Sequence, residues 1–191
     1  MKKTLFTIML VLILVLALAG CTGETPAEGG ADIEDLNVEM GEKSMALAVE
    51  CAALLNGEGG DAHAEVTNAG SRDIDVYQAI YDIMSDFKEA KNAEGANITF
   101  VYTLSKVNDE VTNLIVDASG VDNEDDYGTE YEMEPSMVSA FEGQAANADY
   151  TWEHEELGVL QSAFAPIYNA NGEVVAILGI DIAAPDLPVI E

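Results

Sequence analysis

The sequence predicts an α+β fold in which a long N-terminal helix packs on a central antiparallel sheet. The helix is predicted over residues 33–56, where apolar residues recur at mostly helical spacing, and a second helix follows over residues 73–91. Beyond residue 97 the apolar period changes from 3.6 to 2, which indicates strands. Helices and strands in separate blocks are typical of α+β domains.

Four strands are predicted from segments rich in β-branched and aromatic residues, at 98–107, 111–118, 159–168 and 173–183. They form two hairpins. A turn at 108–110 joins the first pair of strands, and Asn171-Gly172 in the second turn is a dipeptide that hairpins favour. We expect all four strands to pair in one antiparallel sheet.

The remaining segments are predicted to be connections. Residues 57–72 contain three glycines near their start, so we expect a loop there. Residues 119–158 hold an acidic segment, a short helix at 135–142 that begins with a proline, and a polar stretch. We expect this excursion to cover the sheet face opposite the long helix and to leave a cavity beneath it.

The first 20 residues are predicted to be a bacterial lipoprotein signal peptide. Lys2 and Lys3 form a positive n-region, and residues 5–18 are apolar apart from one threonine. That stretch is shorter than the roughly 20 residues that span a bilayer. It ends in Leu-Ala-Gly-Cys, which resembles the lipobox, so Cys21 is the predicted lipidation site. The alternative is an ordinary secretory signal in which Cys21 is incidental.

The mature chain is predicted to comprise a flexible, polar tether at 21–32, one domain at 33–185 and a tail at 186–191. Removal of Lys2 and Lys3 leaves five of the seven basic residues against all 36 acidic residues, a net charge of −31. Such a charge repels nucleic acid and anionic headgroups, so nucleic-acid binding is excluded. The acidity is explained either by a salty habitat or by cationic ligands. Cys51, alone once Cys21 is acylated, has no disulfide partner.

Five segments share a pattern with one known family: ALAVECAALLNGE (46–58), ITFVYTLSKVNDEVTNLIVDASG (98–120), GTEYE (128–132), MVSAFEG (137–143) and FAPIYNANGEVVAILGIDI (164–182). They resemble the extracytoplasmic single-Cache domains, which are PAS-like sensor modules of chemoreceptors, histidine kinases and cyclases. The resemblance implies a PAS/Cache-like fold and a pocket for a small extracellular solute, with no chemistry and no cofactor. It also implies a weak homodimer through the first helix.

In amino-acid-binding members of that family, an Asp in a closing Gly-x-Asp motif pairs with the ligand amine. The matching residues here are Gly179-Ile180-Asp181. Those members also hold the ligand carboxylate with an Arg and a Trp-Tyr pair, a motif that this chain lacks. The resemblance therefore implies a solute that bears an amine or another cationic group.

Two carboxylates on strands are candidate binding residues. A carboxylate in an apolar strand is costly to bury unless it is paired, so Asp181 is predicted either to meet a bound cation or to cap backbone amides. We expect the small Gly179 beside it to leave room for a ligand. Asp117 ends its strand in the same way, and its alternative role is to form a turn.

Two aromatic residues complete the candidate set. Tyr102 shares a strand face with Phe100 and Leu104. It is predicted either to form a wall of the pocket or to belong to the hydrophobic core. Trp152 lies in the excursion, where it would either stack on a ligand or pack on the sheet. The candidate ligand-binding residues are thus Tyr102, Asp117, Trp152 and Asp181.

Metal and catalytic motifs are weak or missing. The acidic run at 122–126 lacks the spacing of a calcium-binding EF-hand, and Glu153-His154-Glu155-Glu156 offers one imidazole among glutamates. No phosphate-binding glycine loop, zinc-protease motif or nucleophile–base pair is recognisable. We therefore expect no enzyme activity and no metal site.

The sequence indicates a lipid-anchored, extracytoplasmic domain that binds a small solute and presents it to a membrane receptor partner or simply holds it. The membrane is reached through the lipid alone. Two alternatives remain: an acidic structural or interaction lipoprotein of the cell surface, and a divalent-cation-binding one. A cavity lined by Asp181, Tyr102 and Trp152 would favour the domain that binds a small solute over both alternatives.

The assignment of Cys21 leads to a direct test. We expect Cys21→Ser to abolish both membrane association and labelling by fatty acid, because the lipid is attached through that thiol. Fractionation of cells that express either form measures this. Cys51→Ser is the matched control and should remain in the membrane fraction, whereas continued partitioning of Cys21→Ser after detergent-free washing would contradict the anchor.

Overall fold

The computed structural model describes residues 33–72, 74–120 and 127–190, which belong to one compact unit. The predicted signal peptide, Cys21, the tether and the acidic run at 122–126 lie outside the described residues. In chain order the elements are α1 (Ile33–Leu54), α2 (Glu58–Ala69), α3 (Asp75–Ala93), β1 (Ile98–Lys106), β2 (Val111–Asp117), β3 (Glu130–Glu132), α4 (Pro135–Phe141), β4 (Ala146–His154), β5 (Gly158–Tyr168) and β6 (Val174–Ala183).

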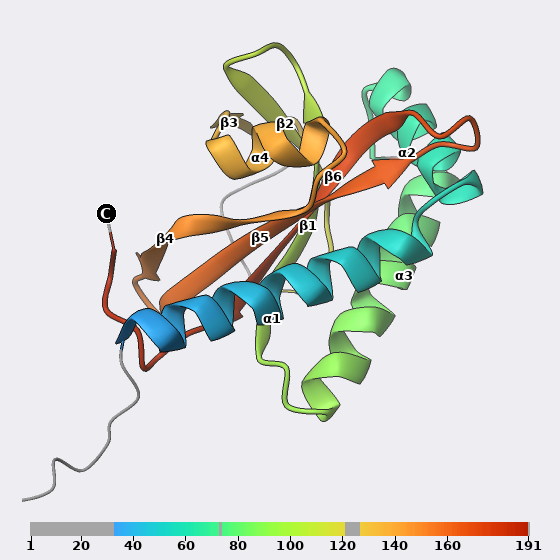
Figure 1. Ribbon diagram of the computed structural model, residues 1–191. Coiled ribbons are helices and arrows are strands. Elements are labelled where there is room, and N and C mark those ends of the chain that lie inside the picture. Colours follow the sequence, from blue (N-terminus) through green and yellow to red (C-terminus); the bar gives the residue numbers. More distant parts are fainter. Residues whose placement is uncertain (1–32, 73, 121–126, 191) are drawn as a thin grey trace, which may run out of the picture. The chain divides into compact units, whose positions relative to one another are not determined.

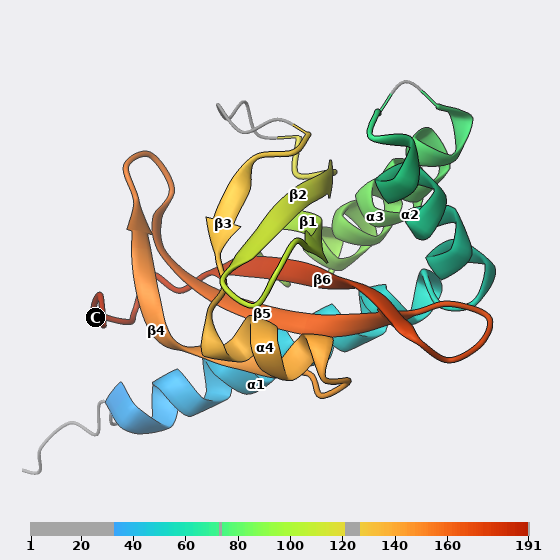
Figure 2. The same cartoon turned by 90° about the horizontal axis from the view of Figure 1, so that it is seen from above.

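The strands form one antiparallel sheet in the order β3-β2-β1-β6-β5-β4 (Figures 1 and 2). The two predicted hairpins are β1–β2 and β5–β6, and they meet where β1 pairs with β6. The last strand in the sequence is therefore a central strand of the sheet. The short β3 and the longer β4 extend the two edges.

Helices cover the two faces unequally. The helices α1, α2 and α3 pack on one face, while α4 lies on the other (Figure 1). The strands alternate accordingly, since successive side chains of a strand point to opposite faces. On β6, Leu178, Ile180 and Ile182 join the core under the helices. Ile177 joins a smaller cluster under α4, whose other buried members are Leu104, Leu114, Met137, Ala140 and Phe164. This arrangement confirms the predicted α+β fold class.

Residues 57–72 were predicted to be a loop, but most of them form α2, so that prediction was wrong. Gly60 lies inside the helix, and a Cβ atom there would be 2.3 Å from the backbone oxygen of Tyr168. The glycine therefore allows α2 to approach the end of β5, rather than ending a helix. The backbone amide of Gly57 also donates to the oxygen of Tyr168, at 2.8 Å.

The polar stretch after residue 143 was also predicted as a connection, but it forms β4. Its alternation is interrupted by a register shift between Asn147 and Thr151, which hides the strand period in the sequence. The segment that follows β6 lies along this edge strand, because Thr151 Oγ1 donates to the carbonyl of Pro188 at 2.6 Å and accepts from the amide of Ile190 at 2.9 Å. Within the described residues the sheet thus has six strands, where four were predicted.

No helix in the described part of the chain combines the length and the hydrophobicity needed to cross a bilayer. The predicted homodimer through α1 remains a prediction.

The close approach at Gly60 can be tested with a matched pair of variants. We expect Gly60→Ala to lower the free energy of unfolding by about 1–3 kcal/mol, because the new methyl group collides with backbone that cannot move aside. Gly59→Ala is the control, since its Cβ would have no neighbour closer than 3.8 Å. Denaturant titrations of both variants measure the difference, and equal stabilities would contradict the packing argument.

Candidate functional site

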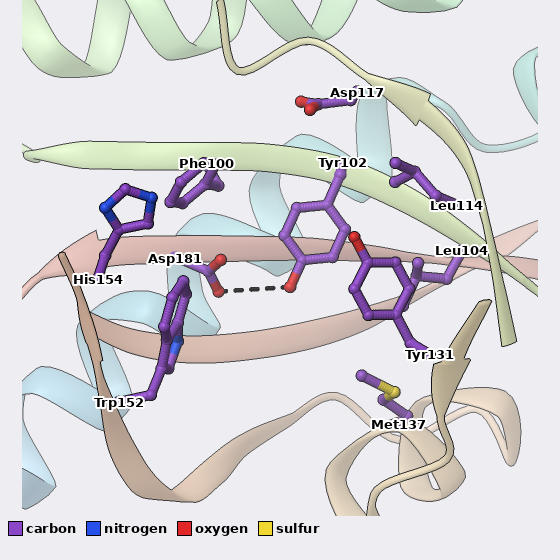
Figure 3. A pocket seen from close by; sticks show the side chains of 10 residues that line it. All are labelled: Phe100, Tyr102, Leu104, Leu114, Asp117, Tyr131, Met137, Trp152, His154 and Asp181. Carbon is purple, nitrogen blue, oxygen red and sulfur yellow. Dashed lines mark hydrogen bonds between the residues drawn. The ribbon is translucent and has the colours of Figure 1, made fainter. Parts of the chain in front are cut away.

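A cavity of about 290 Å³ lies on the sheet face that carries α4 (Figure 3). All four candidate binding residues of the sequence line it, although they come from four different strands. Their role in binding remains a prediction, but the structure brings them together. The lining side chains are Phe100, Tyr102, Leu104, Leu114, Asp117, Tyr131, Met137, Trp152, His154 and Asp181.

Strand register places these side chains in two rows, because directly opposed residues of neighbouring strands share a face. In one row, Asp181 of β6 lies between Phe100 of β1 and Ser162 of β5. In the next row, Tyr102 of β1 lies between Asp117 of β2 and Gly179 of β6. The central position of β6 therefore surrounds the Asp181 carboxylate with residues from both sides.

Asp181 is a buried carboxylate, 3% exposed. The hydroxyl of Tyr102 donates to its Oδ1 at 3.4 Å, and the hydroxyl of Ser162 is a second hydrogen-bond partner. Burial raises its pKa from 3.8 to about 7, and the two hydroxyls counteract part of that rise. Among the described residues, no lysine or arginine forms an ion pair with Asp181.

The described hydrogen bonds to the Asp181 carboxylate are donated by side-chain hydroxyls. One of the two predicted alternatives was that Asp181 caps backbone amides, and these bonds are of a different kind. Both partners are electrically neutral. The carboxylate therefore has hydrogen-bond donors but no described countercharge. A bound cation, which was the other predicted alternative, would supply that countercharge.

Gly179 was expected to leave room for a ligand, and this expectation was wrong. A Cβ atom at Gly179 would lie 2.4 Å from Cε2 and 2.9 Å from the hydroxyl oxygen of Tyr102. The glycine therefore makes room for the tyrosine ring, which lies across β6 and brings its hydroxyl to Asp181 (Figure 3). Burial, followed by the negative charge of Asp181, raises the pKa of Tyr102, so this hydroxyl keeps its proton.

Trp152 comes from the edge strand β4 and forms the aromatic end of the pocket. Its ring stacks on Phe100 with centroids 6.1 Å apart, and His154 lies against the same phenylalanine at 5.6 Å. The indole Nε1–H donates to Ser162 Oγ at 3.0 Å. Ser162 therefore connects the tryptophan to Asp181. It was absent from the predicted site, because a register shift between Ile167 and Tyr168 prevents its pairing with Asp181 from being counted back from the hairpin turn.

Asp117 has the turn-forming role that was its predicted alternative, and its role in binding remains a prediction. Its carboxylate lines the pocket and also accepts hydrogen bonds from the amide of Ser119, at 2.8 Å, and from the Ser119 hydroxyl. Lys88 of α3 donates to the carbonyl oxygens of Thr99, at 2.7 Å, and of Ser119. Burial lowers the pKa of Lys88, and the nearby negative charge of Asp117 opposes that shift. Asp117 therefore has a cation close by, in contrast to Asp181.

A second tyrosine–carboxylate pair lies near the pocket and was not predicted. The hydroxyl of Tyr150 donates to Glu134 Oε2 at 2.6 Å. Burial and this bond raise the pKa of Tyr150. The negative charge of Glu134 in turn contributes to the raised pKa of Asp181. In the sequence these residues are 16 positions apart, and both belong to the predicted excursion at 119–158.

Within residues 33–72, 74–120 and 127–190, no group of three or more histidine, cysteine, aspartate or glutamate side chains is arranged to hold an ion. His154 instead contacts the aromatic end of the pocket, and its Nδ1 accepts the amide of Glu156 at 3.2 Å.

No protein-family model matches the sequence, and no curated protein matches it. Among solved structures, the periplasmic sensory domain of the Campylobacter jejuni chemoreceptor Tlp1 aligns with a TM-score of 0.42 and 13% identity, over 79% of this chain and 55% of that chain. The ligand-binding domain of C. jejuni Tlp3 in complex with L-valine gives a TM-score of 0.34, 13% identity, and coverages of 82% and 66%. Its complex with 4-methylisoleucine gives 0.35, 12%, 86% and 65%.

The chain therefore spans between about half and two thirds of these three chains. Each of them is a sensory or ligand-binding domain of a chemoreceptor.

The raised pKa of Asp181 predicts how stability depends on pH. Between 3.8 and about 7 the folded protein holds a proton that the unfolded chain releases, so stability falls as pH rises through this window. Asp181→Asn cannot lose that proton. We therefore expect its Tm to exceed that of the wild type by a few degrees at pH 8, and the difference to shrink or reverse at pH 4.

Calorimetry on the unliganded protein at both pH values measures this difference. Asp149→Asn, which removes the same charge from an exposed position on β4, is the matched control for net charge. A Tm of Asp181→Asn that lies below the wild type by the same amount at pH 4 and pH 8 would show that burial of the ionised carboxylate is not destabilising.

Proposed function

We propose that this protein is a lipid-anchored, extracytoplasmic domain of the sensor type that binds a small solute bearing an amine or another cationic group, without catalysing a reaction. The observation that supports this most directly is a buried carboxylate, that of Asp181, with no described positive partner. Asp181 is buried in the wall of a cavity, and its described partners are neutral hydroxyls. A positive charge placed beside it would pair with a group that is otherwise costly to ionise.

The other walls suit the same kind of solute. Phe100 and Trp152 line the cavity, and aromatic rings attract an ammonium group within about 6 Å of a ring centroid. Leu104, Leu114 and Met137 form an apolar part of the pocket that would contact an aliphatic portion of the solute. A few convergent polar groups in a mostly apolar cavity are the usual composition of a small-molecule site.

The two alternative functions predict different features. A purely structural protein would have this sheet face sealed by packed side chains, whereas a cavity remains open there. A divalent-cation-binding protein would bring several carboxylates to one point, whereas Asp117 and Asp181 lie on either side of Tyr102. In the proposal, the lipid on Cys21 holds the domain at the outer surface of the cytoplasmic or outer membrane, where a receptor partner could meet it.

A thermal-shift screen tests this function. The full chain, purified in a mild detergent, would be scanned with primary and quaternary amines, organic acids and divalent cations at pH 8. We expect amines to raise the Tm in a concentration-dependent way, because a ligand that binds only the folded state stabilises it. Stabilisation by organic acids or by calcium, with no effect of any amine, would contradict the proposal.

The role of Asp181 can be tested on any amine that the screen identifies. We expect Asp181→Asn to weaken binding by about one to two decades, since a hydrogen bond to a charged group contributes about 1.5–3 kcal/mol and 1.4 kcal/mol is about tenfold. Calorimetric titration measures the affinity. Asp149→Asn is again the control, and an affinity of Asp181→Asn equal to that of the control would show that the carboxylate makes no contact with the ligand.

A further inference from the structure

The two carboxylates of the pocket differ in how their charge is balanced. Asp117 has the amide and hydroxyl of Ser119 as donors and the ammonium group of Lys88 nearby. Asp181 has only the hydroxyls of Tyr102 and Ser162 among its described partners. When both carboxylates are ionised, one negative charge of the pocket is offset by the protein itself and the other is not.

The groups that face Asp181 from the neighbouring elements increase this imbalance. Besides Tyr102 and Tyr131, they are the carboxylates of Asp117 and Glu134, the Tyr150 hydroxyl and the imidazole of His154. Both neighbouring carboxylates disfavour ionisation of Asp181. In the unliganded protein the simplest way to neutralise the site is therefore to leave a proton on Asp181.

We propose that the pocket binds its ligand by exchange: a solute with a single positive charge enters beside Asp181, and one proton leaves. The O–H bond of the carboxylic acid breaks, the proton passes to the solvent, and the carboxylate pairs with the incoming cation, so the net charge of the site is unchanged. This inference rests on the proposed function and adds to it the charge of the ligand and the dependence of binding on pH.

The limit of one charge follows from the rest of the pocket. A second positive group on the same solute would meet either Asp117, which already has Lys88 nearby, or the apolar side chains. Glu134 is not among the lining residues, and its carboxylate already accepts the Tyr150 hydroxyl. Burial of an unpaired charge among apolar groups is strongly unfavourable. The apolar side chains in question are Leu104, Leu114 and Met137.

The protein contains its own reporter for the proton. Trp152 is the only tryptophan of the chain, and its indole N–H donates to the hydroxyl that interacts with Asp181. We expect the tryptophan emission of the unliganded full chain to change with pH in one transition near pH 7. That transition should be lost in Asp181→Asn and retained in His154→Gln, which removes the imidazole that lies next to the indole ring.

Calorimetric titration of the full chain with pentan-1-amine and with 1,5-diaminopentane tests the exchange. Between pH 5 and pH 8, in pairs of buffers that differ in ionisation enthalpy, the number of protons released can be counted. We expect release of nearly one proton per pentan-1-amine below pH 6 and of almost none above pH 8. The affinity should fall about tenfold for each pH unit below 7. The diamine, of equal length, should bind at least about tenfold more weakly, because its second charge has no partner.

Each result decides between the two proposals. If neither amine binds at any pH, the proposed amine-binding function fails, and the exchange fails with it. If pentan-1-amine binds without releasing a proton, or with the same affinity at pH 5 and pH 8, the exchange alone is overturned. Binding of the diamine as tightly as the monoamine would overturn the limit of one charge.

Discussion

The arrangement of the pocket depends on the burial of one carboxylate at the centre of the sheet. Asp181 belongs to a strand that has neighbours on both sides, so its side chain is enclosed by β1 and β5 instead of reaching solvent at an edge. Ionisation of a group in such a place must be supported by hydrogen bonds or by countercharges. The geometry of Tyr102, Gly179 and Ser162 follows from this requirement.

Tyr102 shows how the requirement constrains the sequence. Its ring can reach the carboxylate only by lying flat across β6, and this is possible only because Gly179 has no side chain. Ser162 meets the carboxylate from the opposite strand and receives the indole N–H of Trp152. One acidic residue thus determines a tyrosine, a glycine, a serine and the orientation of a tryptophan, on four different strands. A hydrogen-bond network of this kind holds pocket side chains in fixed positions before any ligand arrives.

Local patterns in the sequence were sufficient to predict the fold class and the four strands β1, β2, β5 and β6. The predicted segment 173–183, for example, differs from β6 by one residue, because alternation and turn chemistry are properties of the strand and its hairpin alone. The strand β4 could not be predicted in this way, since its pairing with β5 includes a register shift that only the partner strand defines. Gly60 was misjudged for a related reason: its neighbour, Tyr168, is distant in the sequence.

Some residues of the candidate site could be recognised from the sequence, and others required the register of the strands. A charge in an apolar strand is visible in the sequence, so Asp181 could be singled out, and Tyr102 followed from its strand pattern. Trp152 was singled out only as an aromatic residue of the predicted excursion. Ser162 could not, because a serine has no distinguishing feature until the register of β5 and β6 is known. The reason given for Gly179 was incorrect because a missing side chain can serve a ligand or a neighbouring ring, and the sequence does not distinguish the two.

The opposite face of the sheet holds β1 through a buried histidine. His63 of α2 is buried there, and its Nε2 shares a hydrogen bond of 2.8 Å with Thr103 Oγ1, which also accepts the amide of Val116. Thr103 lies at the register shift of β1, next to Tyr102, so this bond helps to set the strand from which the tyrosine projects. Burial lowers the pKa of His63 to about 4. The imidazole is therefore neutral near pH 7, so its hydrogen bond to Thr103 does not depend on the charge of Asp181 on the other face.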